Sequence, residues 1–162
     1  MFEKKKKSFT VDEIKRKLEQ YCVYQDRCHK EVEQKMRDYE LIPEAKEIIL
    51  LSLMQDNFLN EERFAKSFAR GKFRIKSWGK QRITRELKFR DISAYNIKTA
   101  LKEIDEQAYL KTIYSITEKR STSISETNNY KKKKKLIDFL MRKGFENELI
   151  FKTVNDVLDE PI

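Results

Sequence analysis

The sequence predicts an all-α protein built from three consecutive three-helix units. The first observation behind this prediction is the scarcity of turn residues. The 162-residue chain holds three glycines and two prolines, far fewer than sheets and glycine-rich cofactor loops require. The second observation is a spacing of apolar residues that occurs three times along the chain. The third is an amphipathic stretch, at helical spacing, ahead of each of these repeats.

The repeated pattern consists of two apolar residues four positions apart, followed by a third five positions later. The first step places two side chains on one helix face, and the second crosses a short turn. The three copies are Val32, Met36 and Leu41, then Ile83, Leu87 and Ile92, then Leu136, Leu140 and Phe145. In the second and third copies an isoleucine, Ile97 or Ile150, follows ten residues after the central residue. In the first copy Ile48 follows twelve residues after Met36, which predicts a two-residue insertion near Pro43.

Each turn contains residues suited to ending one helix and beginning the next. Gly144 in the third copy can end a helix in the left-handed conformation, and Asp91 in the second copy tolerates that conformation better than most residues. Pro43 is typical of the first turn of a helix, and Ser93 is typical of an N-cap. We therefore expect a helix, a tight turn and a second helix in every unit.

A further amphipathic helix is expected ahead of each of these helix pairs. Asn60 is a favourable N-cap, and Glu61 and Glu62 complement the positive end of the helix dipole. The expected buried faces are Phe64, Ala65, Phe68 and Ala69 in the second unit, Tyr109, Ile113 and Ile116 in the third, and Ile14, Leu18 and Tyr21 in the first. In chain order the predicted helices are 10–21, 29–39, 43–55, 60–75, 79–89, 93–103, 106–119, 130–142 and 146–158.

The three predicted units span residues 10–56, 57–104 and 105–160. Residues 1–9 are expected to form a basic, flexible tail, because four consecutive lysines occur there with no apolar core after them. Residues 121–129 are polar and lack periodicity, so a mobile loop is expected within the third unit.

The residue types needed for common catalytic and metal sites are scarce. No glycine cluster could form a dinucleotide fingerprint or a phosphate-binding loop. One histidine and two cysteines cannot form a structural zinc finger, and the adjacent Cys28 and His29 would not face each other on a helix. We therefore expect no catalytic residues, no metal and no cofactor, and predict that the protein is not an enzyme. Cys22 and Cys28 are expected to be free thiols in a reducing cytoplasm, and no stretch is typical of a membrane span or a signal peptide.

Charge is distributed unevenly along the sequence. The net charge is +9, but residues 31–62 have a local balance of −6 and residues 71–90 a balance of +7. A basic segment next to an acidic one favours contact with an acidic protein surface or a nucleic acid, and plain solvation is the alternative. The candidate partner-binding or DNA-binding residues are Lys72, Arg74, Lys76, Lys80, Arg82, Arg85, Lys88, Arg90, Lys131, Lys132, Arg142 and Lys143.

Within the basic segment, helical spacing places Arg85 and Lys88 opposite the apolar stripe, so both should be exposed. Phe73 and Trp78 lie between the basic residues in the sequence. Trp78 either packs in the core, as aromatic residues at helical spacing more often do, or stacks on a base of a nucleic acid. The lysine run 131–135 is less informative, because lysines around a whole helix turn cannot all face one ligand.

Several short motifs, in their order along the chain, resemble those of the RecX family of regulatory proteins. The motifs are Tyr24-Gln25-Asp26-Arg27-Cys28-His29-Lys30-Glu31-Val32, Asn60-Glu61-Glu62-Arg63-Phe64-Ala65, Trp78-Gly79-Lys80 followed by Ile83-x-x-Glu86-Leu87, and Phe139-Leu140-Met141-Arg142-Lys143-Gly144-Phe145. The resemblance covers about residues 20–158 and implies an elongated, curved array of three tandem three-helix repeats. Cys28 stands where the family usually has serine, and Asp38-Tyr39 and Arg90-Asp91 stand where it often has a glycine turn.

The resemblance further implies a non-enzymatic modulator of the RecA recombinase. Such a protein would bind in the groove of the RecA–single-stranded DNA filament and limit its growth. It would thereby reduce ATP hydrolysis, strand exchange and the co-protease activity that drives the SOS response. We expect it to act in DNA repair and recombination as a cytoplasmic monomer without contact to a membrane. A second hypothesis stays open, in which a helical-repeat module binds single- or double-stranded DNA directly and acts by competition.

Overall fold

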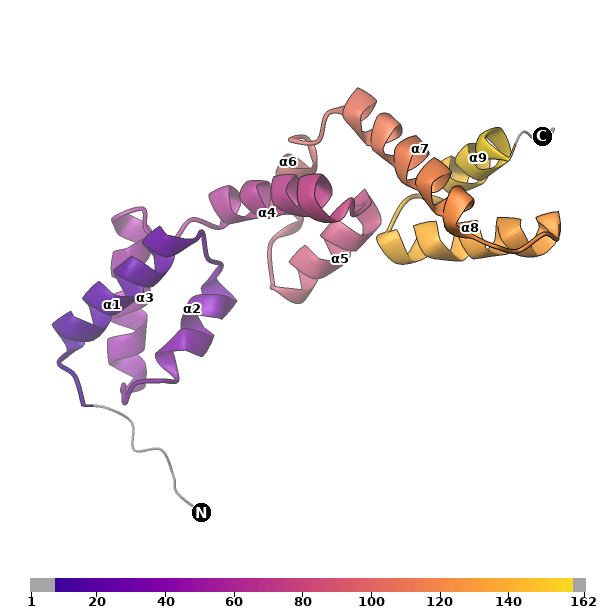
Figure 1. Ribbon diagram of the computed structural model, residues 1–162. Helices are drawn as coiled ribbons and strands as arrows, with labels where there is room; N and C mark the ends of the chain where they lie inside the picture. The colour runs from indigo at the N-terminus through magenta and orange to yellow at the C-terminus, as the bar shows by residue number, and fades with distance from the viewer. Residues whose placement is uncertain (1–7, 159–162) are drawn as a thin grey trace, which may run out of the picture.

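A computed structural model describes residues 8–158, and the regular structure in these residues is helical (Figure 1). The helices of this part of the chain are α1 (Val11–Tyr24), α2 (His29–Met36), α3 (Pro43–Gln55), α4 (Glu61–Lys76), α5 (Lys80–Phe89), α6 (Ala94–Leu101), α7 (Glu106–Ser123), α8 (Asn129–Lys143) and α9 (Asn147–Val157). The predicted all-α fold is therefore confirmed. No helix within residues 8–158 is both long and apolar enough to cross a bilayer.

The helices pack in three consecutive groups, which we call the first, second and third units. Helices α1, α2 and α3 contact one another, and so do α4, α5 and α6, and α7, α8 and α9. The three units follow one another along an extended, bent path, so that α1 and α9 lie at opposite ends of the molecule (Figure 1). The protein is thus an elongated array of three-helix repeats.

The apolar core is divided unequally among the three units. One cluster, which includes Met36 and Leu53, belongs to the first unit. A second cluster, which includes Leu87 and Leu140, runs through both the second and the third unit. Cys28 at the N-cap of α2 also lies in this second cluster. The second and third units therefore share one core, whereas the first unit has its own.

The three central residues of the predicted repeat, Met36, Leu87 and Leu140, are fully buried. One part of the predicted alignment is wrong, because Ile48 is 64% exposed and Ile49 is the residue that packs in the core. The first unit therefore contains an insertion of three residues, not two, between its central residue and the buried isoleucine. This extra residue rotates α3 by about 100° relative to the predicted alignment.

The turns of the second and third units contain the predicted left-handed residues. The φ angle is 58° at Asp91 and 93° at Gly144. The corresponding turn of the first unit has no described residue with a positive φ angle. There the amide of Arg37 donates to the carbonyl of Gln34 at 3.2 Å, which closes α2 with a tight 3₁₀-type turn. The second unit also has such a bond, from the amide of Arg90 to the carbonyl of Leu87 at 3.1 Å, so the first unit differs in lacking a left-handed residue after it.

The predicted helix starts at Asn60 and Ser93 are confirmed. The side chain of Asn60 accepts a hydrogen bond from the amide of Arg63 at 2.9 Å, and that of Ser93 accepts one from Asn96 at 3.1 Å. Pro43 occupies the first turn of α3, where its missing amide hydrogen has no intrahelical partner to lose. These ends are therefore fixed by local chemistry.

Helix α7 extends farther than predicted, to Ser123. The hydroxyls of Thr122 and Ser123 donate to backbone carbonyls three residues earlier, at 2.9 and 2.8 Å. Ile124, directly after the helix, packs against the core. Polar residues that suggested a loop thus satisfy the last carbonyls of the helix, and residues 124–128 connect α7 to α8.

The predicted basic tail falls largely outside the described residues. Of its last residues, Phe9 packs against Tyr39, with the two ring centroids 5.8 Å apart. The ammonium group of Lys17 lies 4.6 Å from the centroid of the Phe9 ring. Phe9 is therefore part of the first unit.

Candidate partner-binding surface

The second and third units meet at two glycines in direct contact. A Cβ atom at Gly79 would lie 2.3 Å from the backbone carbonyl of Gly144, and one at Gly144 would lie 2.2 Å from the Cβ atom of Arg82. Only glycine can therefore occupy these two positions without moving the backbone. The contact places the N-terminus of α5 against the C-terminus of α8.

Backbone hydrogen bonds lock this contact. The amide of Gly79 donates to the carbonyl of Lys143 at 2.7 Å, and the amide of Gln81 donates to the carbonyl of Gly144 at 2.9 Å. Amides at the start of a helix and carbonyls at its end lack partners within their own helix. Here the two sets of groups satisfy each other across the junction, which fixes α5 relative to α8.

Tyr109 of α7 adds a buried polar link at the same junction. Its hydroxyl accepts a hydrogen bond from the amide of Lys80 at 2.9 Å and donates one to the carboxylate of Glu146. Burial raises the pKa of Tyr109 well above its usual range, and the hydrogen bond to Glu146 raises it further. Tyr109 is therefore a neutral hydrogen-bonding group that connects α7, α5 and the start of α9.

Four of the predicted binding residues converge on this junction. Nη1 of Arg82 donates to the carbonyl of Arg142 at 3.0 Å, and Nζ of Lys143 donates to the carbonyl of Lys76 at 2.8 Å. The members of these pairs are 60 and 67 positions apart in the sequence. The ends of α4 and α8 and the start of α5 thus form one cationic surface, which we call the basic junction.

Arg85 extends the basic junction and lines two grooves. One groove has a volume of about 520 Å³ and is lined by Arg82, Arg85, Glu86, Met141 and Arg142. The other has a volume of about 550 Å³ and is lined by Lys80, Gln81, Thr84, Arg85, Lys88 and Glu146. The predicted exposure of Arg85 and Lys88 is confirmed. Helix α5 therefore presents a basic side chain to any ligand that lies across the junction.

Positive charge accumulates at the basic junction. Partial burial lowers the pKa of Lys143, and the positive charges of Arg82 and Lys76 lower it further. An anion bound among these groups would relieve their mutual repulsion. The junction is therefore suited to a phosphate or carboxylate group.

The two carboxylates that line the grooves are engaged within the protein. Glu86 pairs with Nη1 of Arg90 at 2.9 Å, and Glu146 accepts the hydrogen bond from Tyr109. These internal contacts turn the acidic groups toward the protein, so that Arg82, Arg85 and Arg142 dominate the charge that a ligand meets.

Three predicted binding residues also have contacts inside the protein. Arg90 also faces Glu31 of the first unit at 3.9 Å. Lys80 pairs with Glu106 at 3.0 Å. Lys72 lies over two aromatic rings, 5.5 and 5.0 Å from their centroids. The basic segment therefore supplies contacts within and between units as well as an exposed cationic surface.

The remaining predicted residues, Arg74, Lys131 and Lys132, line neither groove of the basic junction. Arg74 is exposed on α4. Lys131 and Lys132 lie in the first turn of α8, roughly 15 Å along the helix from Arg142 at 1.5 Å per residue. The amide of Lys131 donates to the N-cap side chain of Asn128 at 3.1 Å. The structure therefore does not bring the lysine run together with the basic junction.

Trp78 is partly buried and packs against the core, which favours the packing alternative over base stacking. Its ring packs edge-on against Phe68, with the centroids 6.3 Å apart. The guanidinium of Arg82 lies 4.1 Å from the Trp78 ring centroid, and the ammonium of Lys72 lies 5.0 Å from it. Cationic side chains thus already cover the ring, and one of them, Arg82, also belongs to the basic junction.

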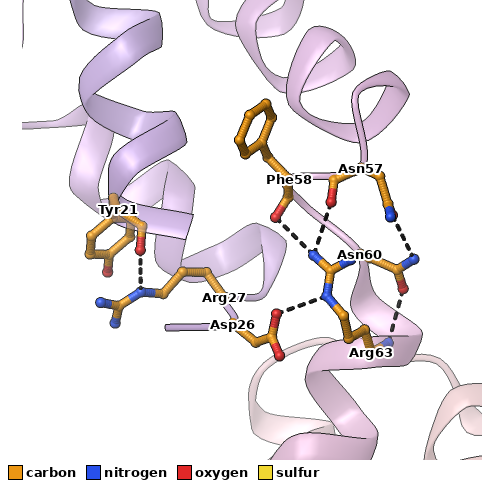
Figure 2. Close-up of polar contacts among 7 residues, drawn as sticks. All are labelled: Tyr21, Asp26, Arg27, Asn57, Phe58, Asn60 and Arg63. Atoms are coloured by element: carbon orange, nitrogen blue, oxygen red, sulfur yellow. Dashed lines mark hydrogen bonds and ion pairs between the residues drawn. The ribbon is translucent and has the colours of Figure 1, made fainter. Parts of the chain in front are cut away.

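The first unit joins the second through polar contacts at the start of α4 (Figure 2). Nε of Arg63 donates to Asp26 at 2.8 Å, and its Nη2 donates to the carbonyls of Asn57 and Phe58 at 3.0 and 3.1 Å. The side chain of Asn60 bonds to that of Asn57 at 3.1 Å and also caps α4. This network fixes the loop between α1 and α2 against the start of α4.

The sequence indicates the basic residues but not how the fold brings them together. The contact between Gly79 and Gly144 depends on two turns in different units, and Met141 lies beside Arg142 in a groove that only the packed units create. One signal was available, because two of three glycines in the chain lie next to basic residues at the ends of predicted helices.

Comparison with known proteins gives the same family for both C-terminal units. Residues 60–101 match the model described as RecX, second three-helix domain, and residues 107–154 match RecX, third three-helix domain. A regulatory protein RecX of Bacillus cytotoxicus is 25% identical over 140 residues, which cover 86% of this chain and 52% of the relative. One of Enterococcus faecalis is 28% identical over 153 residues, which cover 93% and 56%. The chain spans about half the length of these curated relatives.

Solved structures have the same fold. A crystal structure of RecX from Lactobacillus salivarius is similar to this chain with a TM-score of 0.79 and 22% identity, covering 91% of this chain and 96% of that one. A crystal structure of a regulatory protein RecX has a TM-score of 0.76 and 19% identity, covering 90% and 71%. The two matched family models together span more than half of the sequence. From its sequence and its fold alike, the chain belongs to the RecX family.

Proposed function

We propose that this protein binds the RecA–single-stranded DNA filament and limits its growth. Slower growth would reduce ATP hydrolysis, strand exchange and co-protease activity, and so the protein would modulate recombination, DNA repair and the SOS response. Membership of the RecX family supports this proposal, since the curated relatives are described as regulatory proteins. The protein would act as a non-enzymatic regulator in the cytoplasm.

The observation that carries the proposal is the basic junction. Arg82, Arg85 and Arg142 come from two units and line adjoining grooves, and the contact of Gly79 with Gly144 fixes their positions. Because the backbone that carries these groups is fixed before binding, no rearrangement of the two units is needed when an acidic surface or a phosphate backbone binds. Charge at such a surface contributes speed of association and sensitivity to salt more than raw affinity.

The shape and charge asymmetry of the molecule favour a polymer of protein and DNA over DNA alone. The three units lie along an extended path (Figure 1), which could reach more than one protomer of a filament. Residues 31–62, most of which belong to the first unit, have a net charge of −6, whereas residues 71–90 have a net charge of +7. This acidic stretch would repel a DNA backbone, but it can contact a basic protein surface while the basic stretch binds acidic groups.

The test is ATP hydrolysis by the cognate RecA on single-stranded DNA, with this protein added at ratios far below one per RecA protomer. DNA is kept in excess, so that competition for free DNA cannot lower the rate. We expect inhibition at these low ratios and little effect of further DNA. Inhibition that occurs only when DNA is limiting, and not when it is in excess, would instead support direct competition for nucleic acid. No inhibition under either condition would contradict both hypotheses.

A further inference from the structure

A glycine in the middle of α4 has no explanation within the protein. Gly71 is the eleventh residue of this sixteen-residue helix, where glycine costs about 1 kcal/mol relative to alanine. A Cβ atom at Gly71 would meet nothing within 4 Å, and its φ angle is not positive. The other two glycines are required by a close backbone contact. The open space above Gly71 therefore points to the close approach of something outside the chain.

Gly71 lines a groove between α4 and the loop that follows α1. The groove has a volume of about 320 Å³ and is lined by Gln25, Asp26, Phe64, Ser67, Phe68, Gly71, Lys72, Ile75 and Lys76. Phe64 and Phe68 are core residues or pack against the core, whereas Ile75 is 79% exposed. An apolar floor thus continues into an exposed apolar side chain at one end of the groove.

Both walls of this groove are held in place. Asp26 in the loop is fixed by the 2.8 Å contact with Nε of Arg63 (Figure 2), and the opposite wall is α4 itself. Lys72 lies over the rings of Phe68 and Trp78. The groove is therefore formed before any ligand binds, which favours affinity because few side chains need to be ordered.

Charge at the groove selects its ligand. Lys72 and Lys76 line it one helix turn apart on α4, and Arg74 and Ile75 lie between them in the sequence, both exposed. The carboxylate that lines it, Asp26, is engaged with Arg63. An apolar floor with a cationic rim is complementary to a protein segment that carries an apolar side chain next to a carboxylate.

A nucleic acid base fits this groove less well than such a segment. Base recognition without sequence preference relies on open aromatic faces. Here the guanidinium of Arg90 lies 4.8 Å from the centroid of the Phe68 ring, and Lys72 lies 5.5 Å from it. The ring of Phe64 is almost completely buried. The aromatic residues therefore offer an apolar floor for a side chain but no free face for stacking.

We call the groove lined by Gly71 the Gly71 groove. We propose that it is a docking site for a protein segment of the RecA filament that carries an apolar side chain next to a carboxylate. The apolar side chain of that segment would lie over Gly71 against Phe68 and Ile75, with its carboxylate near Lys72 and Lys76. Because Nζ of Lys143 bonds to the carbonyl of Lys76, the groove ends beside the basic junction, and one partner can contact both surfaces. This proposal rests on the proposed function, since it assigns one of the surfaces that contact the filament.

The test fills the groove without disturbing the core. Gly71→Trp places a large side chain in the open space, and Ile75→Glu puts a negative charge at an exposed position on the rim. Ser115→Trp, at an exposed position of α7 outside the groove, is the matched control for adding a tryptophan to a helix. Binding is measured as retention on immobilised RecA–poly(dT) filaments, and separately as retention on poly(dT) without RecA. Circular dichroism checks the fold of each variant.

We expect both groove variants to bind the filament about tenfold more weakly than the unmodified protein or Ser115→Trp, which is typical of losing a central interface contact, and to bind free poly(dT) unchanged. If Gly71→Trp does not fold, Ile75→Glu decides the question.

Filament binding of both variants at the original strength would overturn the assignment of the groove while leaving the proposed function intact. An equal loss on free poly(dT) would assign the groove to nucleic acid and overturn the protein segment. If the unmodified protein does not bind the filament, the proposed function fails and the groove assignment fails with it.

Discussion

Arg85 is the basic side chain that lines both grooves of the basic junction. It is exposed on α5. Ile83 and Leu87 of the same helix are fully buried, so the apolar face fixes the direction of the charged one. Other arginines of the segment, such as Arg90, are occupied by contacts within the protein. Binding of a partner therefore depends on the basic side chains that are exposed and not already paired within the protein.

Charge reversal of Arg85 and Lys88 should weaken inhibition without unfolding the protein. Replacing two cationic contacts by anionic ones reverses the attraction to an acidic surface, and because both residues are exposed the helix content should not change. For the double variant Arg85→Glu with Lys88→Glu we expect a loss of about tenfold or more in inhibitory potency, equivalent to at least about 1.4 kcal/mol, measured in the RecA ATP hydrolysis assay.

Lys111→Glu is the matched control, because Lys111 is exposed on α7 and lines neither groove. Its inhibitory potency should stay close to that of the unmodified protein. Unaltered inhibition by the Arg85 and Lys88 double variant would mean that another surface of the protein contacts the filament.

Tyr109 gives a prediction for stability at alkaline pH. Its pKa is raised in the folded protein, so the unfolded chain releases the phenolic proton near pH 10 while the folded chain keeps it. The stabilisation from Tyr109 is therefore complete below about pH 10 and is lost as the pH rises from there toward the folded pKa, by up to about 1.4 kcal/mol per pH unit. Urea unfolding of the unmodified protein and of Tyr109→Phe between pH 8 and 11 measures this loss.

Below pH 10 the Tyr109→Phe variant should be less stable by about 1–3 kcal/mol, because the amide of Lys80 and the carboxylate of Glu146 lose their partner. The difference between the two proteins should shrink above pH 10. A difference that stays constant up to pH 11 would mean that the hydroxyl of Tyr109 ionises as readily in the folded chain as in the unfolded one.

At the scale of elements, α5 and α8 are joined end to end instead of side by side. The amides at the start of α5 bond to the carbonyls at the end of α8, and glycines allow the backbones to approach. Helix α4 carries its glycine for a different reason, since the space beside Gly71 is open. Two glycines are thus structural, and the third is the one whose role we assign to binding.

Alanine substitutions at Gly79 and Gly71 should have effects of opposite sign on stability. At Gly79 the added methyl group would clash with the backbone of Gly144, and overpacking of this kind costs about 1–3 kcal/mol. At Gly71 the methyl group meets open space and restricts the unfolded chain, which should stabilise α4 by about 0.4–1 kcal/mol. Urea unfolding followed by circular dichroism measures both. Two changes of the same sign would contradict the division of glycines into structural and binding positions.

At the scale of the whole molecule, the array is not three equivalent units. The second and third units share a core cluster, whereas the first unit has a separate one and is attached by polar contacts and Cys28. Apolar burial dominates folding cooperativity, while partly exposed ion pairs contribute little. The second and third units should therefore unfold together, and the first unit should unfold more independently.

The single tryptophan allows this to be measured. Trp78 packs against the shared core, so its fluorescence follows the second and third units, whereas circular dichroism follows all helices. Leu53→Ala in the first unit should lower the midpoint seen by circular dichroism and leave that of fluorescence nearly unchanged. Leu87→Ala should lower the fluorescence midpoint, because removing this buried side chain costs about 2–5 kcal/mol. Equal shifts of the fluorescence midpoint by both variants would mean that the three units unfold as one.

The sequence by itself determined the helices and their order, because the signals for them are local. N-caps such as Asn60 and Ser93, the left-handed turn residues Asp91 and Gly144, and the four-residue spacing of apolar side chains act within a few positions of one another. Where local signals were weaker, the prediction was less accurate. The first unit lacks a left-handed turn, and its alignment was wrong by one residue.

Tertiary structure alone decided which residues form the surfaces. The contacts of Arg82 with Arg142 and of Lys143 with Lys76 join residues 60 or more positions apart, and no local pattern encodes such a pairing. Arg90 is a second example. Its place in the basic segment predicts a binding residue, but in the folded protein it pairs with Glu86 and faces Glu31 of the first unit. Helix formation depends on neighbours within one or two turns, whereas a binding surface depends on how the helices pack, and so the sequence predicted the elements and the fold determined the site.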